Sequence, residues 1–518
     1  MTQIVSLIVL VIFVAVTCFI GVASTKKANT LDGFLLGGRN IGAWLSAFAY
    51  GTSYFSAVIF IGYAGKHGWD IGLASIWIGI GNAIIGSAIA WILLAKKTRR
   101  MTISLSARTM PEMFAGRYNS KGLKIYSALI IFIFLVPYAA SVYKGLGSLF
   151  STIFPVFGDN GTVICMAIVA VFTAVYLVLG GYVATAVNSL VQGILMLAGV
   201  ILMVVGIINN PAVGGLANGI EALKAESPAL TSVFGGSNFN FLAVNILLTS
   251  FGVWGLPQMV HKFSALKSEK NIPQATIIST IFAIIIGCGA YLAGSFGRFF
   301  IPALENGQPE CGFDYVIPEM LTKAFGDNIG GSILIAVLLV CVLSASMSTL
   351  SSVVLTSASS ITVDLIPTVK KTPLKANRQM LLTRGLCLAF VLLSFIFATS
   401  NFAVIVSIMA YSWGIVAGCF LGPYIWGLYW KKTTKAGAWA GMISGVAVVA
   451  IMVIYGIITS PVLETDGLYA AFKAVSTNSP TFGCVAMAVS VVIVPLVRLF
   501  TKKPDAEVVE RAFSVPAE

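Results

Sequence analysis

The sequence is poor in charged residues and almost devoid of histidine. Asp, Glu, Lys and Arg make up 10% of its 518 residues, histidine occurs twice, and hydrophobic residues make up 58%. The mean hydropathy of +0.94 lies far outside the range of soluble domains. These values predict an all-α polytopic membrane protein that crosses the cell membrane several times.

Cysteine and histidine are too scattered for a metal centre or a disulfide framework. Seven of the eight cysteines fall within apolar segments and only Cys311 lies in a loop. A membrane enzyme would need a catalytic histidine, a carboxylate pair or a metal set near the membrane face. The two histidines, His67 and His261, are far apart in the sequence. We therefore expect no enzymatic activity and no cofactor.

Apolar stretches of about 20 residues predict thirteen membrane spans. Of the 32 Lys and Arg residues, 26 fall in alternate loops and in the C-terminal tail, which predicts an N-terminus outside and a C-terminus in the cytoplasm. The net charge of +13 is therefore interpreted as a sign of topology, and no nucleic-acid partner is expected. The expected spans are 3–23, 40–66, 70–94, 125–155, 161–180, 183–208, 239–258, 272–302, 330–364, 381–400, 402–429, 436–458 and 481–500.

Acidic side chains are missing from the middle of every predicted span. All nineteen Asp and Glu residues fall in loops, at span ends or in the tail. A proton-coupled carrier usually needs a titratable relay within the membrane, so proton coupling is disfavoured. An alkali cation can instead be held by backbone carbonyl and hydroxyl oxygens.

A cluster of hydroxyls provides such oxygens in the ninth predicted span. Ala345, Ser348, Thr349 and Ser352 have the spacing i, i+3, i+4, i+7, which places them on one helix face. Membrane Ser and Thr also serve helix packing, but the density of this cluster favours a sodium site at Ser348 and Thr349. The hydroxyl residues are Ser344, Ser346, Ser348, Thr349, Ser351 and Ser352.

The second predicted span contains glycines and serines that weaken a helix. Gly51, Gly62 and Gly65, together with Ser53 and Ser56, predict a break that would free carbonyls near residues 52–55. Glycine is also a common packing device in membrane helices. Both interpretations remain open from composition alone.

A series of short motifs between about residues 33 and 432 resembles the sodium/solute symporter family. The resemblance implies a leucine-transporter-like inverted repeat of five plus five helices, over about 40–208 and 239–429, with peripheral spans 3–23, 436–458 and 481–500. It also implies a single transmembrane domain, 1–500, with a short cytoplasmic tail, 501–518. The motifs are Phe34-Leu-Leu-Gly-Gly-Arg39, the stretch 52–62, Thr109-Met-Pro-Glu-Met-Phe-Ala-Gly-Arg117, Gly180-Gly181 with Gln192-Gly193, Gly255-Leu-Pro-Gln258, Met347-Ser-Thr-Leu-Ser351 with Ser360-Ile-Thr-Val-Asp364, and Ala410-Tyr-Ser-Trp413.

The same resemblance implies two binding sites. The sodium ligands would be the carbonyls of Thr52, Phe55 and Ala345 and the hydroxyls of Ser348 and Thr349. Aromatic side chains would close the solute pocket while an amide or a hydroxyl orients the solute, although each of these residues could equally serve packing. The solute residues would be Ser53, Tyr54, Ser56, Tyr138, Trp254, Pro257, Gln258 and Tyr411, with Trp413 as a further candidate.

Sodium-driven uptake of a small organic solute by a monomer is the function implied. The solute would be an amino acid such as proline or a carboxylate such as pantothenate, and Na⁺ would be the only ion required. A sodium-coupled sugar or monocarboxylate symporter is one alternative. A ligand-gated channel and a transport-related sensor are alternatives of another class. The expected partners are the solute, Na⁺ and the lipid bilayer.

Three positions depart from the family pattern or lack an assigned role. Many members carry an Asp where this chain has Ser189, which follows Asn188 on the expected sodium exit path. Proline symporters carry an Asp at the position of Tyr54. Lys144 is a lone cation within a span: it would either extend its amine toward the membrane surface or face the solute cavity and pair with a carboxylate.

Overall fold

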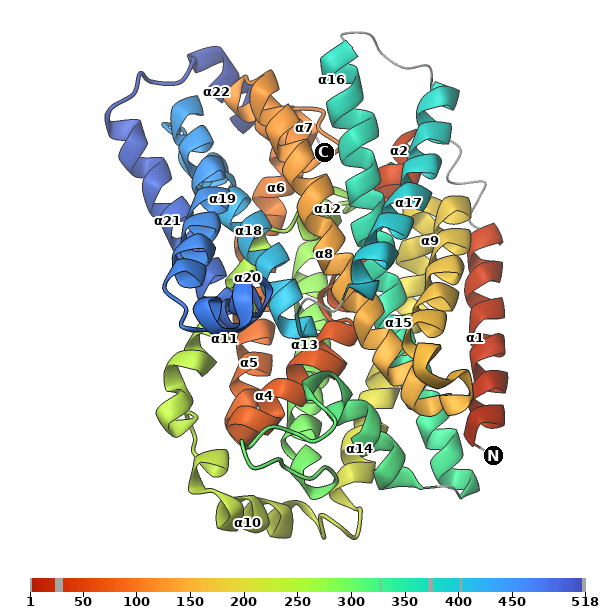
Figure 1. Ribbon diagram of the computed structural model, residues 1–518. Helices are drawn as coiled ribbons and strands as arrows, with labels where there is room; N and C mark the ends of the chain where they lie inside the picture. Colours follow the sequence, from red (N-terminus) through yellow and green to blue (C-terminus); the bar gives the residue numbers. More distant parts are fainter. Residues whose placement is uncertain (1, 24–30, 327, 371–375, 401–402, 515–518) are drawn as a thin grey trace.

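Long helices packed side by side make up the computed structural model (Figure 1), which describes residues 2–23, 31–326, 328–370, 376–400 and 403–514. Within these ranges no β-strand forms beyond two isolated bridges. The α-helices are α1 Thr2–Ala23, α2 Leu31–Leu36, α3 Ala43–Tyr54, α4 Ala64–Ile71, α5 Ile76–Gly81, α6 Lys96–Ser104, α7 Met110–Tyr118, α8 Lys121–Ile153, α9 Gly161–Ile208, α10 Leu216–Glu226, α11 Phe239–Gly252, α12 Pro257–Ser264, α13 Ile272–Ser295, α14 Val316–Phe325, α15 Ile329–Ser359, α16 Ile366–Lys370, α17 Ala376–Thr399, α18 Ile405–Tyr429, α19 Lys435–Ile458, α20 Val462–Val475, α21 Ser479–Leu499 and α22 Ala506–Phe513.

Wider π-helical turns extend three of these spans. They are η3 Val58–Tyr63 before α4, η5 Asn82–Ile89 with η6 Trp91–Ala95 between α5 and α6, and η14 Ser360–Leu365 after α15. The expected tail forms α22, which packs against α6 and α7. Its last residues, 515–518, lie outside the described part of the chain.

Ten helical segments of the described chain are long and apolar enough to cross a membrane, or eleven when a bent pair counts as one span. Each of the ten overlaps most of one of the thirteen predicted spans. The other three predictions are 40–66, 161–180 and 239–258. The first and third of these are interrupted helices, and the second appears as a shorter apolar helix, Gly161–Val175. The number of long apolar helices is smaller than the number of predicted spans because a broken helix does not form one continuous apolar helix.

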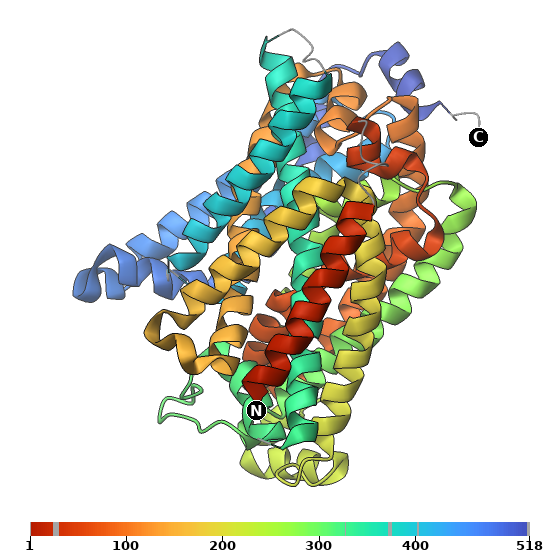
Figure 2. The same cartoon turned by 90° about the vertical axis from the view of Figure 1, so that its right-hand side faces the viewer.

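The two ends of the helical bundle differ in what they carry. The N-terminus lies at one end together with α10 and α14, and the C-terminus lies at the other end near α7, α16 and α22 (Figures 1 and 2). Helices α6, α7 and α16, which lie in or beside segments expected in the cytoplasm, are at this second end (Figure 1). A chain whose termini lie at opposite ends crosses the bundle an odd number of times.

Burial separates central from peripheral helices. In the most apolar stretch of α18, 94% of the residues are buried, and in the span that contains α15 the value is 83%, whereas it is 28% for α1, α17 and α19. Small residues allow the close packing of α18: a β-carbon on Gly414 would lie 2.5 Å from the Gly483 backbone, and one on Gly422 would lie 2.3 Å from the Ser490 carbonyl oxygen. Helix α1 lies at one edge of the bundle and α19 and α21 at the opposite edge (Figure 1).

Two helices are broken near the centre of the protein. The first break follows α3, where Phe55 is extended (φ −103°, ψ 122°), and the chain becomes helical again at Ala57. The second separates α11 from α12 with a bend of 51°. Leu256 is extended there because it precedes Pro257. Both breaks interrupt backbone hydrogen bonding inside the protein, where other groups must replace it.

The predicted glycines of the first broken helix serve packing and do not lie at the break. A β-carbon on Gly51 would lie 2.5 Å from the Phe282 ring, and one on Gly62 would lie 2.7 Å from the Ile405 side chain. The predicted break is thus confirmed, but its backbone is supported from α15: the Ala57 amide donates to Ser346 Oγ at 3.1 Å.

Candidate functional site

Oxygen atoms converge where the end of α3 meets α15. Thr349 Oγ1 lies 3.2 Å from the carbonyl oxygen of Thr52, 3.4 Å from that of Ser53 and 3.1 Å from that of Ala345. A threonine hydroxyl has one proton to donate, so it cannot satisfy three carbonyls at once. The excess of acceptor oxygens creates a locally negative position that suits a small cation.

Ser348 extends this group of oxygens to one further helix, α9. Its Oγ lies 2.7 Å from Thr52 Oγ1 on α3 and 2.9 Å from Ser189 Oγ on α9. All three side chains are buried. Hydrogen-bond contacts thus join four of the five predicted sodium ligands, and the fifth, Phe55, is the extended residue at the break itself.

The donor set consists of neutral oxygens. No group of three or more His, Cys, Asp or Glu residues that could hold a metal occurs in the described chain. Carbonyl and hydroxyl oxygens suit hard cations and can replace the hydration shell of an alkali ion. The residues present therefore fit Na⁺ better than a transition metal.

The other hydroxyls of the cluster have separate roles. Ser346 Oγ accepts the hydrogen bond from the Ala57 amide. The Ser351 hydroxyl donates to the Ser348 carbonyl at 2.9 Å. Ser352 Oγ lies 2.9 Å from Ser53 Oγ. Ser344 Oγ is buried without a hydrogen-bond partner among the described residues. The cluster thus connects α15 to the broken helix at several points.

Three aromatic rings border the oxygen site. Trp413 on α18 packs against Tyr54 at 6.2 Å and against Tyr138 at 5.6 Å between ring centroids. The Tyr54 hydroxyl donates to the Thr249 carbonyl at 2.7 Å, and the Tyr138 hydroxyl is close to the side chains of Ser56 and Thr349. An apolar solute body could pack on these rings next to the oxygens.

Two polar groups near the breaks have no partner in the described chain. Both amide atoms of Gln258 are buried and unbonded, and so is Trp413 Nε1. Gln258 stands at the start of α12, which packs against α3 and α15. Buried polar groups are nearly always hydrogen-bonded, so these free donors and acceptors are suited to a bound ligand.

Some of the residues predicted to bind the solute or line the sodium exit path have partners away from the oxygen site. Tyr411 stacks on Phe472 of the peripheral α20 and contacts Ser476, so Trp413 takes the place expected for it. Asn188 Nδ2 donates to the Thr17 carbonyl of α1 at 3.4 Å. The Trp254 indole N–H donates to the Ile85 carbonyl at 3.0 Å.

Lys144 pairs with a carboxylate. Its Nζ lies 3.1 Å from Asp314 Oδ2 and donates to the Ala403 carbonyl at 2.7 Å. Asp314 also accepts the backbone amide of Ile405, at the start of α18. The pair borders a polar cavity of about 400 Å³ on the side of the bundle where the N-terminus lies. The expected pairing of Lys144 with a carboxylate is thus confirmed.

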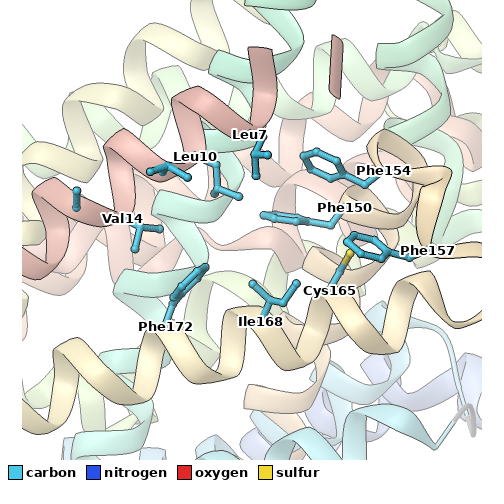
Figure 3. A pocket seen from close by; sticks show the side chains of 11 residues that line it. Leu7, Leu10, Val14, Phe150, Phe154, Phe157, Cys165, Ile168 and Phe172 are labelled. Atoms are coloured by element: carbon cyan, nitrogen blue, oxygen red, sulfur yellow. The ribbon is translucent and has the colours of Figure 1, made fainter. Parts of the chain in front are cut away.

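A second cavity, of about 590 Å³, is wholly apolar (Figure 3). It lies between α1, α8 and α9, and side chains such as Leu10, Phe150 and Phe172 point into it. Without a polar group it offers nothing to orient an ion or a polar solute.

Sequence reasoning overlooked Lys262. The predicted spans 239–258 and 272–302 leave this residue in the loop between them, but the structure places it in α12 with 1% of its surface exposed. Its Nζ donates to Ser352 Oγ at 2.9 Å. The available signal was that Lys262 follows the Gly255-Leu-Pro-Gln258 motif by only four residues, about one helical turn.

Comparison with known proteins agrees with this geometry. Residues 34–445 match the sodium:solute symporter family. This chain belongs to the sodium:solute symporter family. Sodium/proline symporters of Staphylococcus aureus strains JH9 and USA300 are 29% identical to it over 508 residues, which cover 96% of this chain and 93% of each relative.

Solved structures show the same fold. A Na⁺-coupled sialic acid symporter, described as substrate-bound and outward-open, aligns with a TM-score of 0.75 at 15% identity, over 97% of this chain and 98% of the other. A nucleobase-cation-symport-1 family transporter in a closed conformation aligns with a TM-score of 0.55 at 14% identity, over 92% and 97%.

Membership in the sodium:solute symporter family establishes the general type of transport. The protein is a sodium-coupled solute symporter of the cell membrane, a multi-pass transporter and not an enzyme. Na⁺ and an organic solute are its transported substrates. The channel alternative is therefore set aside.

The departure from the family pattern expected at Ser189 is testable, because this side chain contacts Ser348. Ser189→Asp places a carboxylate next to Ser348 and is expected to lower the Na⁺ concentration for half-maximal uptake by about tenfold, because an adjacent anion stabilises the bound cation. Asn188→Asp makes the same change of charge but faces α1, so it serves as the control. An unchanged sodium half-saturation in Ser189→Asp would contradict the prediction.

Proposed function

We propose that this symporter imports a small zwitterionic amino acid, proline or a close analogue, together with Na⁺. The observation that carries the proposal is Trp413 packed against the rings of Tyr54 and Tyr138, together with the unbonded amide of Gln258 at the start of α12, which packs against α3 and α15. An amide and an indole N–H can orient a carboxylate and an amine, and the rings can cover an apolar ring or chain. The relatives named sodium/proline symporters support the same solute class.

The proposed site lies where both broken helices meet α15. Sodium is held by the carbonyls of Thr52, Phe55 and Ala345 and the hydroxyls of Ser348 and Thr349. The solute is held next to it by Tyr54, Tyr138, Gln258 and Trp413, with Ser53 and Ser56 between the two. Because one helix break contributes to both sites, binding of Na⁺ orders the backbone that the solute contacts. Such sharing couples the two fluxes.

The proposed topology has thirteen crossings, with the N-terminus outside and the C-terminus in the cytoplasm. The opposite placement of the termini supports it (Figure 1), as does the grouping of basic loops at the C-terminal end. Two five-helix halves of opposite orientation, each beginning with a broken helix, account for the breaks after α3 and α11. We expect the monomer to be the transporting unit, since the described sites lie within one chain.

Uptake into proteoliposomes tests the function. Radiolabelled proline, pantothenate, pyruvate, a sugar and sialic acid are supplied with and without an inward Na⁺ gradient. The proposal expects sodium-dependent accumulation of proline and little of the others. Each net positive charge carried inward contributes about 2.3 kcal/mol per 100 mV, so an inside-negative potential should increase uptake. Accumulation that is indifferent to Na⁺ would refute the coupling.

Gln258→Leu tests the solute site separately from the sodium site. It removes an amide that can make two hydrogen bonds, each worth roughly 0.5–1.5 kcal/mol, so the solute half-saturation should rise about ten- to a hundredfold. Sodium half-saturation at saturating solute should stay unchanged. Gln274→Leu, on the exposed face of α13, is the matched control. Equal solute affinity in both variants would remove Gln258 from the site.

A further inference from the structure

The amine of Lys262 is buried in the protein interior and has no acidic partner among the described residues. Its side chain is buried, its Nζ donates to Ser352 Oγ at 2.9 Å, and it lies 4.9 Å from the centroid of the Tyr182 ring. None of the ion pairs formed by the described residues includes it. A hydroxyl and a ring face offset only part of the cost of burying an ammonium group.

Two side-chain contacts connect this ammonium to the sodium site. Ser352 Oγ, which accepts from Lys262, is 2.9 Å from Ser53 Oγ, and the Ser53 carbonyl is 3.4 Å from Thr349 Oγ1. The side chains between them are uncharged. Position 189, where a carboxylate could neutralise a cation, is occupied by a serine that contacts Ser348. The fixed charge and a bound Na⁺ would therefore face each other across neutral hydroxyls.

We infer that the ammonium group of Lys262 is a built-in cation that repels Na⁺ at the neighbouring site and so sets sodium affinity and release. The inference rests on the proposed sodium site. Two like charges a few hydrogen bonds apart in a partly polar interior change affinity by about tenfold. Because α12 begins at the second helix break, a rearrangement of that break moves the charge relative to α15. Approach of Lys262 would then expel Na⁺, and its withdrawal would allow Na⁺ to bind.

Charge and hydrogen bonding at position 262 can be separated. Lys262→Gln keeps a donor for Ser352 but removes the charge, whereas Lys262→Arg keeps the charge. Lys267→Gln, on an exposed position of the following loop, is the matched control. In proteoliposomes, Lys262→Gln is expected to lower the Na⁺ concentration for half-maximal uptake by about tenfold. Lys262→Arg and Lys267→Gln should stay close to the wild type.

An unchanged or higher sodium half-saturation in Lys262→Gln would overturn the inference. So would a rise in solute half-saturation alone, which would mean that Lys262 binds the solute carboxylate. Lys262→Met, which removes the charge and the donor together, should give the same sodium shift and replaces Lys262→Gln if that variant does not fold. Sodium-independent uptake by the wild type would instead refute the proposed function, and the wild-type measurement alone reveals it.

Discussion

Replacing Ser348 and Thr349 together by alanine is expected to raise the Na⁺ concentration for half-maximal uptake by about a hundredfold or more. Each hydroxyl is a direct ligand in the proposed site, and a bond to a charged group contributes roughly 1.5–3 kcal/mol. Every 1.4 kcal/mol corresponds to about tenfold in affinity. At ordinary sodium concentrations the double variant should therefore lose nearly all gradient-driven accumulation.

The measurement is uptake over a range of Na⁺ concentrations, together with sodium-independent solute exchange. Exchange should persist at high solute concentration, because the carbonyls and the aromatic rings remain. Thr356→Ala with Ser359→Ala is the control, since the Ser359 hydroxyl bonds only within α15, to the Thr356 carbonyl. Normal sodium dependence in the Ser348 and Thr349 double variant would show that the cation binds elsewhere.

Lys144→Met is expected to destabilise the protein by roughly 3–5 kcal/mol, because it leaves the Asp314 carboxylate buried without a counter-charge. The two side chains are only 15% and 9% exposed. Lys144→Met with Asp314→Asn removes both charges and should recover most of the loss. The pair also joins α8 to the start of α18, so the single variant should loosen the polar cavity at the N-terminal end of the bundle.

Denaturant-induced unfolding of the detergent-solubilised protein measures this effect. Lys323→Met is the matched control, because Lys323 pairs with Glu319 within a single helix and both side chains are far more exposed, at 46% and 32%. Such a pair contributes only about 0.2–0.5 kcal/mol. A double variant no more stable than Lys144→Met alone would show that the ion pair is not the cause.

Sequence reasoning succeeded where the chemistry was local. The apolar stretches located nearly all the long helices, because a helix must be apolar over about 20 residues to cross lipid. The missing acids and the dense hydroxyls directed the sodium prediction to Ser348 and Thr349, because an ion inside a membrane needs nearby oxygen ligands, and the structure brings both hydroxyls to Thr52 at the end of α3. Pro257 marked the second break, because proline biases the residue before it toward extended backbone.

Residues next to each other in the sequence were separated by the fold. Asn188 and Ser189 differ by one position, but successive helix residues are about 100° apart around the axis, so Asn188 contacts α1 and Ser189 contacts Ser348. Tyr411 and Trp413 are separated in the same way, and only Trp413 reaches Tyr54 and Tyr138. Residue type alone does not tell which helix face looks inward when both faces are apolar.

Long-range pairing was decided by tertiary structure alone. Lys144 meets Asp314 across 170 positions, and Lys262 is buried beside Ser352 although a basic residue at a span end ordinarily faces water. The sequence by itself determined a helical membrane protein with a cluster of hydroxyl oxygens on α15, because the length of the apolar segments is set by the lipid and the spacing of the hydroxyls by the helix period. Only the tertiary structure decided which charges are neutralised and which are not, because burial and partner distance depend on elements far apart in the chain.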